Sequence, residues 1–122
     1  MSDLLIILDY HQKLNDLLLT TARQNDIDEI VKIIVEGYGP VEKIILFGSQ
    51  VKGGVDKYSD LDLIIIKKTN KRFVERLSEV PFLPIPTDVF VYTPEEFERM
   101  KENENPFIIS ALQNAKVIYE KS

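Results

Sequence analysis

The chain contains no cysteine and a single histidine, His11. Without cysteine, neither a disulfide framework nor a thiolate metal site can form, and we expect a reducing, cytoplasmic setting. His11 lies in a predicted helix, where an exposed neutral imidazole is the commoner role. These counts exclude a histidine-rich zinc site and argue against a Ser-His-Asp triad.

A long apolar run is also lacking. The segment from Leu4 to Leu8 is too short for the apolar core of a signal peptide, and no basic residue precedes it. Nothing elsewhere approaches the roughly 20 apolar residues that a membrane-spanning helix needs. We therefore predict a soluble protein with no membrane partner.

Basic residues are outnumbered, with 15 Lys and Arg against 20 Asp and Glu and a net charge of −5. A protein that grips a long nucleic acid normally carries a basic stripe that displaces counterions from phosphates. The one local basic cluster, Lys67-Lys68 with Lys71-Arg72, is too small for such a track. If the chain handles nucleotides, we expect small molecules and not polymers.

At 122 residues, the chain fits one domain, and it contains no repeat or linker-like stretch. Residues 1–25 are expected to form a helical extension, with an apolar stripe that either packs on the sheet or binds a partner or a second copy. Asn25-Asp26 predicts a helix break, because Asp26 and Glu29 form a capping-box pattern for a second helix over residues 27–36. The remaining core is expected to extend to residue 119.

Strand-like runs and helical segments then alternate along the chain. Strands are predicted over residues 43–47, 61–66 and 88–92, with a terminal extended piece at 117–119. Helices are predicted over about residues 71–80, from Thr93-Pro94 onward, and over 107–114, and Glu95, Glu96 and Glu98 are interpreted as a solvated helix face. This pattern predicts an α/β (α+β) fold in which helices cover a small sheet.

The first strand is predicted to end at Gly48-Ser49. A turn at this place exposes backbone N–H groups, and glycine lets a phosphate approach the main chain closely. Ser49 adds a hydroxyl donor at the same point. The sequence therefore indicates a phosphate cradle here.

Three aspartates accompany this turn. Asp60 and Asp62 lie two residues apart at the start of a strand, so both side chains face the same side of the sheet. Asp88 opens another strand. Carboxylates gathered in this way repel one another unless a cation lies between them, and hard oxygen ligands suit Mg²⁺ or Mn²⁺. Three such groups are what a two-metal phosphoryl-transfer site needs.

Gly48-Ser49, ten intervening residues and Asp60-Leu61-Asp62 together resemble the signature of the polymerase-β-like nucleotidyltransferase superfamily. The chain is most similar to its minimal nucleotidyltransferase (MNT) branch, often found as the antitoxin beside a HEPN-domain toxin. Gly39-Pro40-Val41, Gly53 and the run from Asp88 to Phe97 extend the resemblance. It implies a small mixed sheet of the polymerase-β-like type covered by helices.

The resemblance also implies roles for individual residues. Ser49, in the turn with Gly48, binds the terminal phosphates of ATP, and Asp60 and Asp62 bind two Mg²⁺ ions. Asp88 joins the metal site and orients the attacking hydroxyl.

The chain departs from the family pattern at two positions. Family members often carry arginines near the loop glycine, where this chain has Gln50 and Lys52, the latter just before Gly53. Lys52 and Gly53 are expected to contribute to nucleotide binding, although Lys52 lacks the bidentate fork of arginine.

Three functions follow from these residues. The first is a Mg²⁺-dependent antitoxin enzyme that transfers AMP from ATP to a hydroxyl, by family resemblance a tyrosine hydroxyl, of a partner HEPN toxin. The second is a non-catalytic module that neutralises the toxin by occlusion. The third is a transferase for a small hydroxyl compound such as an aminoglycoside, for which a homo-oligomer, formed for example through the N-terminal helix, would have to supply the missing wall.

Overall fold

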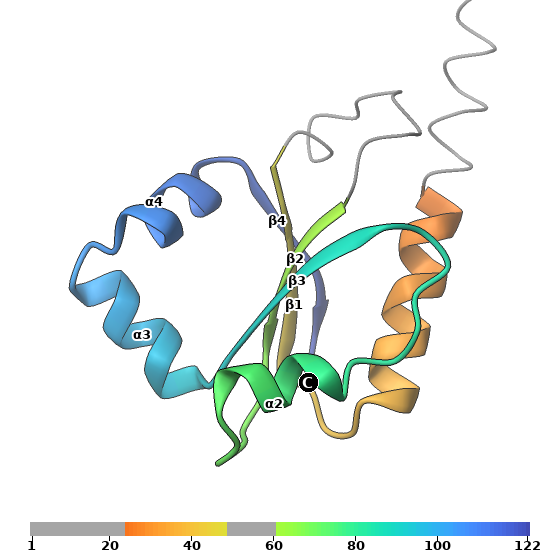
Figure 1. Cartoon of the computed structure of the whole chain (residues 1–122). Coiled ribbons are helices and arrows are strands. Elements are labelled where there is room, and N and C mark those ends of the chain that lie inside the picture. The colour runs from red at the N-terminus through yellow and green to blue at the C-terminus, as the bar shows by residue number, and fades with distance from the viewer. Residues whose placement is uncertain (1–23, 49–60) are drawn as a thin grey trace, which may run out of the picture.

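The computed structural model describes residues 24–48 and 61–122 (Figure 1). A helix covers residues 24–37. The elements that follow it are β1 (Lys43–Phe47), β2 (Leu61–Ile66), α2 (Phe73–Ser78), β3 (Thr87–Tyr92), α3 (Pro94–Glu102), α4 (Pro106–Gln113) and β4 (Ala115–Glu120). Within these ranges, no helix is both long and apolar enough to cross a membrane.

The four strands form one mixed sheet in the order β3-β2-β1-β4. β1 is antiparallel to both β2 and β4, whereas β2 and β3 are parallel and are joined by a connection that contains α2. A parallel pair needs such a crossover, because a tight hairpin can join only antiparallel strands. The mixed sheet and its helical cover confirm the predicted fold class.

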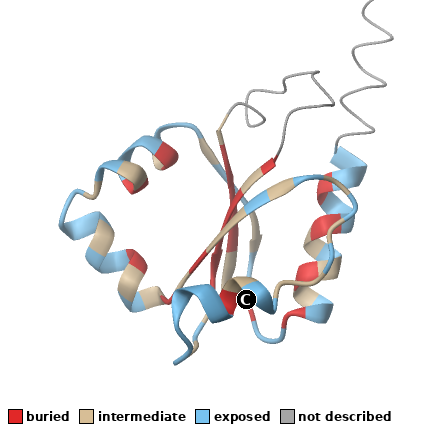
Figure 2. Cartoon of the chain, in the orientation of Figure 1, coloured by how far each residue is buried: buried red, intermediate tan, exposed pale blue. Residues whose placement is uncertain are grey.

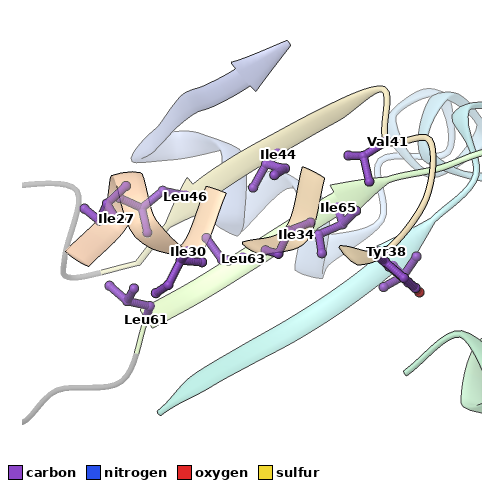
Figure 3. Packing of buried hydrophobic residues seen from close by; sticks show 11 residues of the cluster. Ile27, Ile30, Ile34, Tyr38, Val41, Ile44, Leu46, Leu61, Leu63 and Ile65 are labelled. Carbon is purple, nitrogen blue, oxygen red and sulfur yellow. The ribbon is translucent and has the colours of Figure 1, made fainter. Parts of the chain in front are cut away.

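Each face of the sheet buries its own apolar cluster, because successive strand residues alternate between the faces. The helix over residues 24–37 covers one face and contributes Ile27, Ile30 and Ile34 (Figures 1 and 3). Alternate residues of β1 and β2 meet this helix, and Figure 2 shows the buried positions concentrated on these elements. At roughly 1.5–3 kcal/mol for each fully buried aliphatic side chain, this cluster is a main source of stability.

The opposite face is covered by α3 and α4 (Figure 1). Phe97 of α3 and Ile108 of α4 are buried there against Ile64 of β2. Both helices begin with strong caps. Thr93 forms a complete capping box with Glu96, and the Asn105 side chain accepts hydrogen bonds from two backbone N–H groups at the start of α4. These caps fix where the two helices begin on the sheet.

The predicted elements match the structure closely, apart from one error. The strands over residues 43–47 and 61–66 are confirmed to the residue, and the helix after Thr93 begins at Pro94. The predicted break at Asn25-Asp26 is wrong, because residues 24–26 are helical and continue into the helix that ends at residue 37. Gln24 donates a hydrogen bond to Asp28 one turn later, so these polar residues occupy an exposed helix surface. The predicted helix before residue 24 lies outside the described residues.

Candidate active site

Gly48, Asp62 and Asp88 lie at one end of the sheet, where β1 ends and where β2 and β3 begin. Phe47, which precedes Gly48, is the register partner of Asp62 in the antiparallel pair. Asp62 is in turn the register partner of Asp88 in the parallel pair. The topology therefore brings together three of the residues singled out in the sequence.

The two aspartates also share a face. Asp62 alternates with the residues of β2 that pack against the helix over 24–37, and so it faces the side covered by α3 and α4. Asp88 has the same parity as Phe90 on β3, which packs on that side. Neighbouring strands lie about 4.8 Å apart, so the carboxylates of register partners are close enough to repel each other. Asp62 is half-buried and Asp88 is exposed.

Gly48 has a backbone conformation that other residues adopt rarely, with φ at 83°. A Cβ atom at this position would lie 2.5 Å from Oδ2 of Asp62. Real Cβ atoms essentially never come so close to another heavy atom, so a side chain here would displace the carboxylate. The glycine therefore allows both the sharp turn after β1 and the close approach of Asp62 to the main chain.

A pocket of about 510 Å³ opens beside Gly48 on the α4 side. Phe47 and Gly48 form its sheet wall, and Phe107, Ser110 and Ala111 of α4 form the opposite wall. Gln113 and Asn114, at the end of α4, complete the lining. A cavity of this size is typical of a small-molecule site.

Aromatic rings stabilise the base of this region. The rings of Phe47 and Phe107 meet edge-to-face with centroids 5.7 Å apart, and the rings of Phe90 and Phe107 are 4.8 Å apart. Phe47 also contacts Phe90 at 6.0 Å. Such aromatic pairs contribute about 0.5–1.5 kcal/mol each beyond the area they bury. The three rings link β1, β3 and α4 beside the aspartates.

The other predicted site residues, Ser49, Lys52, Gly53 and Asp60, together with Gln50, lie outside the described residues. Within the described ranges, no group of three His, Cys, Asp or Glu residues is arranged to hold a metal ion. Asp62 and Asp88 supply a pair of carboxylates on one face, and hard oxygen donors of this kind fit Mg²⁺.

The opposite end of the sheet holds a polar network that the sequence did not predict. Arg76 of α2 is buried, and its guanidinium donates hydrogen bonds of 2.7 and 3.2 Å to the two carboxylate oxygens of Glu96. It also donates to the backbone carbonyls of Lys71 and Val91, and the Tyr38 hydroxyl donates to the carbonyl of Arg76. The network joins α2, β3 and α3 to the end of the helix over 24–37.

Glu96 corrects one prediction, because it is not simply part of a solvated helix face. Its Oε1 accepts both from Arg76 and from the backbone N–H of Thr93. The hydrogen bonds from Arg76, more than any other contact, hold the pKa of Glu96 below its ordinary value of 4.5. A sign of Arg76's role does exist in the sequence, since it follows Phe73 by three residues and precedes Val80 by four, on the apolar stripe of its helix.

Two comparisons with known proteins agree with this geometry. A sequence model of a protein family matches residues 27–121, and the family is described as "Nucleotidyltransferase domain". A relative from Haemophilus influenzae (strain ATCC 51907 / DSM 11121 / KW20 / Rd), named "Probable protein adenylyltransferase MntA", is 42% identical over 62 residues. The match covers 48% of this chain and 54% of that protein, so it spans about half the length of the relative. On the match to the family model, the chain belongs to the nucleotidyltransferase domain family.

Proposed function

We propose that this nucleotidyltransferase moves AMP from ATP to a hydroxyl of a partner HEPN toxin, with a tyrosine as the acceptor, and thereby acts as the antitoxin. The observation that carries the proposal is the placement of Asp62 and Asp88 as register partners on one face beside Gly48. The printed name of the Haemophilus relative supports a protein acceptor. The resemblance to the MNT branch supports the choice of a HEPN toxin.

In this proposal, each residue at the end of the sheet has a separate task. The turn at Gly48-Ser49 receives the terminal phosphates of ATP, with Lys52 and Gly53 contributing from the same loop. Asp60, Asp62 and Asp88 would hold two Mg²⁺ ions, which would neutralise the charge of the phosphates and favour deprotonation of the acceptor hydroxyl. The hydroxyl oxygen would form a bond to the α-phosphorus of ATP while the bond to the β-phosphate breaks, and pyrophosphate would leave. Asp88 orients that hydroxyl, and its exposure at the start of the edge strand leaves room for a protein surface.

We also propose that residues 27–119 form the catalytic core of a single domain. Residues 1–25 would then be a helical extension, available for the toxin or for a second copy of the chain. A truncation that begins at residue 24 removes nearly all of the extension and keeps the helix over 24–37 whole. It should keep ATP binding and lose affinity for the partner.

The function is tested by incubating the full chain with ATP, Mg²⁺ and the HEPN protein encoded beside it, and then weighing that protein by mass spectrometry. After reaction with the wild type, we expect the mass of the HEPN protein to increase by that of one or more AMP groups. After reaction with Asp62→Asn, its mass should be unchanged. Asp26→Asn is the matched control, because Asp26 is exposed on the helix over 24–37.

Two results would contradict the proposal in different ways. An unmodified HEPN protein after reaction with the wild type would show that this chain does not transfer AMP to that acceptor. Full neutralisation of the toxin by Asp62→Asn, with no effect of ATP, would instead favour occlusion without catalysis.

A further inference from the structure

We propose that the acceptor protein adds an extended segment to the outer edge of β3, so that its hydroxyl lies beside Asp88. This inference rests on the proposed function, because that function supplies the acceptor and assigns its hydroxyl to Asp88. It adds the mode of binding and the pattern of side chains that the acceptor must carry.

The backbone N–H and C=O groups of β3 face β2 and the outer edge of the sheet in alternation. The carbonyls of Pro86 and Tyr92 accept hydrogen bonds from N–H groups at the start of β2 and just beyond its end. Because these two residues are an even number apart, the residues of the same parity between them also face β2. The groups that face outward, here called the open edge, belong to Thr87, Val89 and Val91.

Most of the open edge is unpaired. The Arg76 guanidinium donates to the carbonyl of Val91 at 3.2 Å and so closes the edge at the end of the strand. Within the described ranges, the outward backbone groups of Thr87 and Val89 have no hydrogen-bond partner. Such groups are a template for a further strand. They lie on either side of Asp88, so the template is continuous with the end of the sheet assigned to the reaction.

The opposite edge of the sheet, β4, is protected against pairing. Its register with β1 shifts between Ile44 and Ile45, and it carries the exposed Lys116. Irregular register and lysines are common means of preventing strand addition. Over residues 87–92, by contrast, β3 contains no lysine or proline and pairs with β2 in continuous register. This contrast favours β3 as the edge that receives a partner.

An apolar pocket of about 390 Å³ lies along the same strand. Thr87 and Val89 form its β3 wall, and Val89 packs on the side of the sheet covered by the helix over 24–37. The pocket therefore lies on the face opposite to Asp88. The connection from α2 to β3 and the end of α2 supply the rest of the lining, which is Leu77, Val80, Pro81, Leu83, Ile85 and Pro86.

Phe82 extends this apolar surface. It lies between the lining residues Pro81 and Leu83, and it is 91% exposed. Phenylalanine is enriched at protein interfaces relative to the rest of the surface. An exposed aromatic ring beside an apolar pocket and an unpaired strand fits a protein segment as the occupant.

The two faces of β3 define the pattern that such a segment must carry. Side chains of an added strand alternate between the faces, so the residue opposite Asp88 shares the face of that carboxylate. Its two neighbours along the segment face the pocket beside Thr87 and Val89. We therefore expect the hydroxyl residue of the acceptor to lie between two apolar residues. In strand addition, main-chain hydrogen bonds supply affinity and pockets for alternate side chains supply specificity.

The first test follows backbone amide hydrogen exchange in the full chain by NMR, with and without the HEPN protein encoded beside it. In the free chain, the outward amides of Thr87 and Val89 should exchange faster than those of Asp88 and Phe90, which face β2. Added HEPN protein should slow exchange of the two outward amides at least about tenfold and leave the other two unchanged. A partner that only covers the surface would not select alternate amides.

Thr87→Pro tests the edge by mutation. Proline removes an outward N–H at the first residue of an edge strand, a position where it is tolerated. Affinity for the HEPN protein, measured by calorimetry, should fall at least about tenfold. Thr87→Val is the matched control, because it keeps the N–H and should bind like the wild type. Mn²⁺ binding should be unchanged in both variants, which separates the edge from the metal site.

Phe82→Ser tests the apolar part of the surface. It should raise the KM for the HEPN protein about tenfold at unchanged kcat, because the ring contacts only the acceptor. Val74→Ser is the matched control, since Val74 is 76% exposed on α2 and does not line the pocket. Equal KM values for these two variants would remove Phe82 from the binding surface.

The outcomes separate this inference from the proposed function. Unchanged exchange at Thr87 and Val89, or equal affinity of Thr87→Pro and the wild type, would overturn strand addition even if AMP is transferred. Slow exchange of both amides in the free chain would show that the edge is already covered, and would also overturn it. Protection of the edge without AMP transfer would support strand addition and contradict the proposed function. If the HEPN protein does not bind, both fail.

Discussion

Charged side chains are arranged differently at the two ends of the sheet. At the end where β3 finishes, the buried guanidinium of Arg76 is matched by Glu96 and by backbone carbonyls. At the end where β2 and β3 begin, Asp62 and Asp88 place two like charges on adjacent strands. Removing one partner of a buried ion pair is strongly destabilising, whereas two neighbouring carboxylates repel each other and favour the binding of a cation between them.

One end of the sheet therefore holds contacts that stabilise the fold, and the other end holds the residues that we assign to the proposed function. Arg76 and Glu96 link α2 to α3 across β3, and so they hold the scaffold on which the aspartates stand. The aspartates are the residues that we assign to the ligand in the proposed function. Substitutions at the two ends should therefore affect different measurements.

The largest expected effect is on activity at the aspartate end. Asp62→Asn should lower the rate of AMP transfer by about 10²–10³-fold or more, because it removes a charge that would hold the metal at the phosphates. Steady-state rates of AMP transfer check this prediction, measured at a temperature where thermal unfolding shows that both proteins are folded. A folded and fully active Asp62→Asn variant would contradict the comparison.

At the other end, the expected effect is on stability. Arg76→Met should lower the free energy of unfolding by about 2–4 kcal/mol, because it breaks the ion pair and leaves buried carbonyls without a donor. Arg99→Met, on the exposed surface of α3, is the control and should change stability by less than about 0.5 kcal/mol. Urea unfolding measures both, and the folded fraction of Arg76→Met should retain AMP transfer.

A pair of glycines offers a matched test of the turn. Gly48 and Gly39 have nearly the same φ, 83° and 85°, so Gly48→Ala and Gly39→Ala should each cost about 1–2 kcal/mol of stability. At Gly39 the new Cβ meets the end of the flexible Lys67 side chain at 3.3 Å, whereas at Gly48 it meets Oδ2 of Asp62.

Only Gly48→Ala should therefore reduce AMP transfer beyond the loss caused by unfolding. Rates measured at a temperature where both variants are fully folded make this comparison. Equal activity in the two variants would show that the position of the Asp62 carboxylate does not matter for the reaction.

The smallest expected effect concerns pH. Because the pKa of Glu96 lies below its ordinary value of 4.5 in the folded chain, its pairing stabilises the fold above that value. This contribution is lost as the pH falls through the folded pKa. The stability difference between wild type and Glu96→Gln should therefore be largest near neutral pH and should shrink below pH 4.5, as followed by urea unfolding at several pH values. A constant difference would contradict the assigned cause.

Much of the fold follows from local patterns in the sequence. The apolar runs at β1 and β2 are bounded by turn residues, and Thr93-Pro94 begins α3 as its capping pattern predicts. Period-two alternation places a β2 side chain on a definite face, but it does not state which strand lies beside it. The alignment of Asp62 with Asp88 depends on parallel pairing, a long-range contact that no local pattern encodes.

The errors and omissions have a related cause. Asp26 and Glu29 form a capping pattern, but residues 24–26 are already helical, so the pattern does not mark the start of this helix. The local hydrogen bond from Gln24 to Asp28 lies on the exposed helix surface. Arg76 and Glu96 are 20 residues apart. The sequence near Arg76 does not indicate which distant residue pairs with it. The pocket beside Gly48 likewise exists only because α4 packs over the end of β1.

The most direct test of the central claim is metal binding at the aspartate end. Loss of the electron paramagnetic resonance signal of free Mn²⁺, titrated without ATP, reports metal bound to the wild type, Asp62→Asn, Asp88→Asn and Arg76→Met. We predict that the wild type and folded Arg76→Met bind Mn²⁺ equally, whereas each aspartate variant binds it at least about tenfold more weakly. Equal Mn²⁺ binding by all four proteins would contradict the assignment of Asp62 and Asp88 as the metal-binding pair.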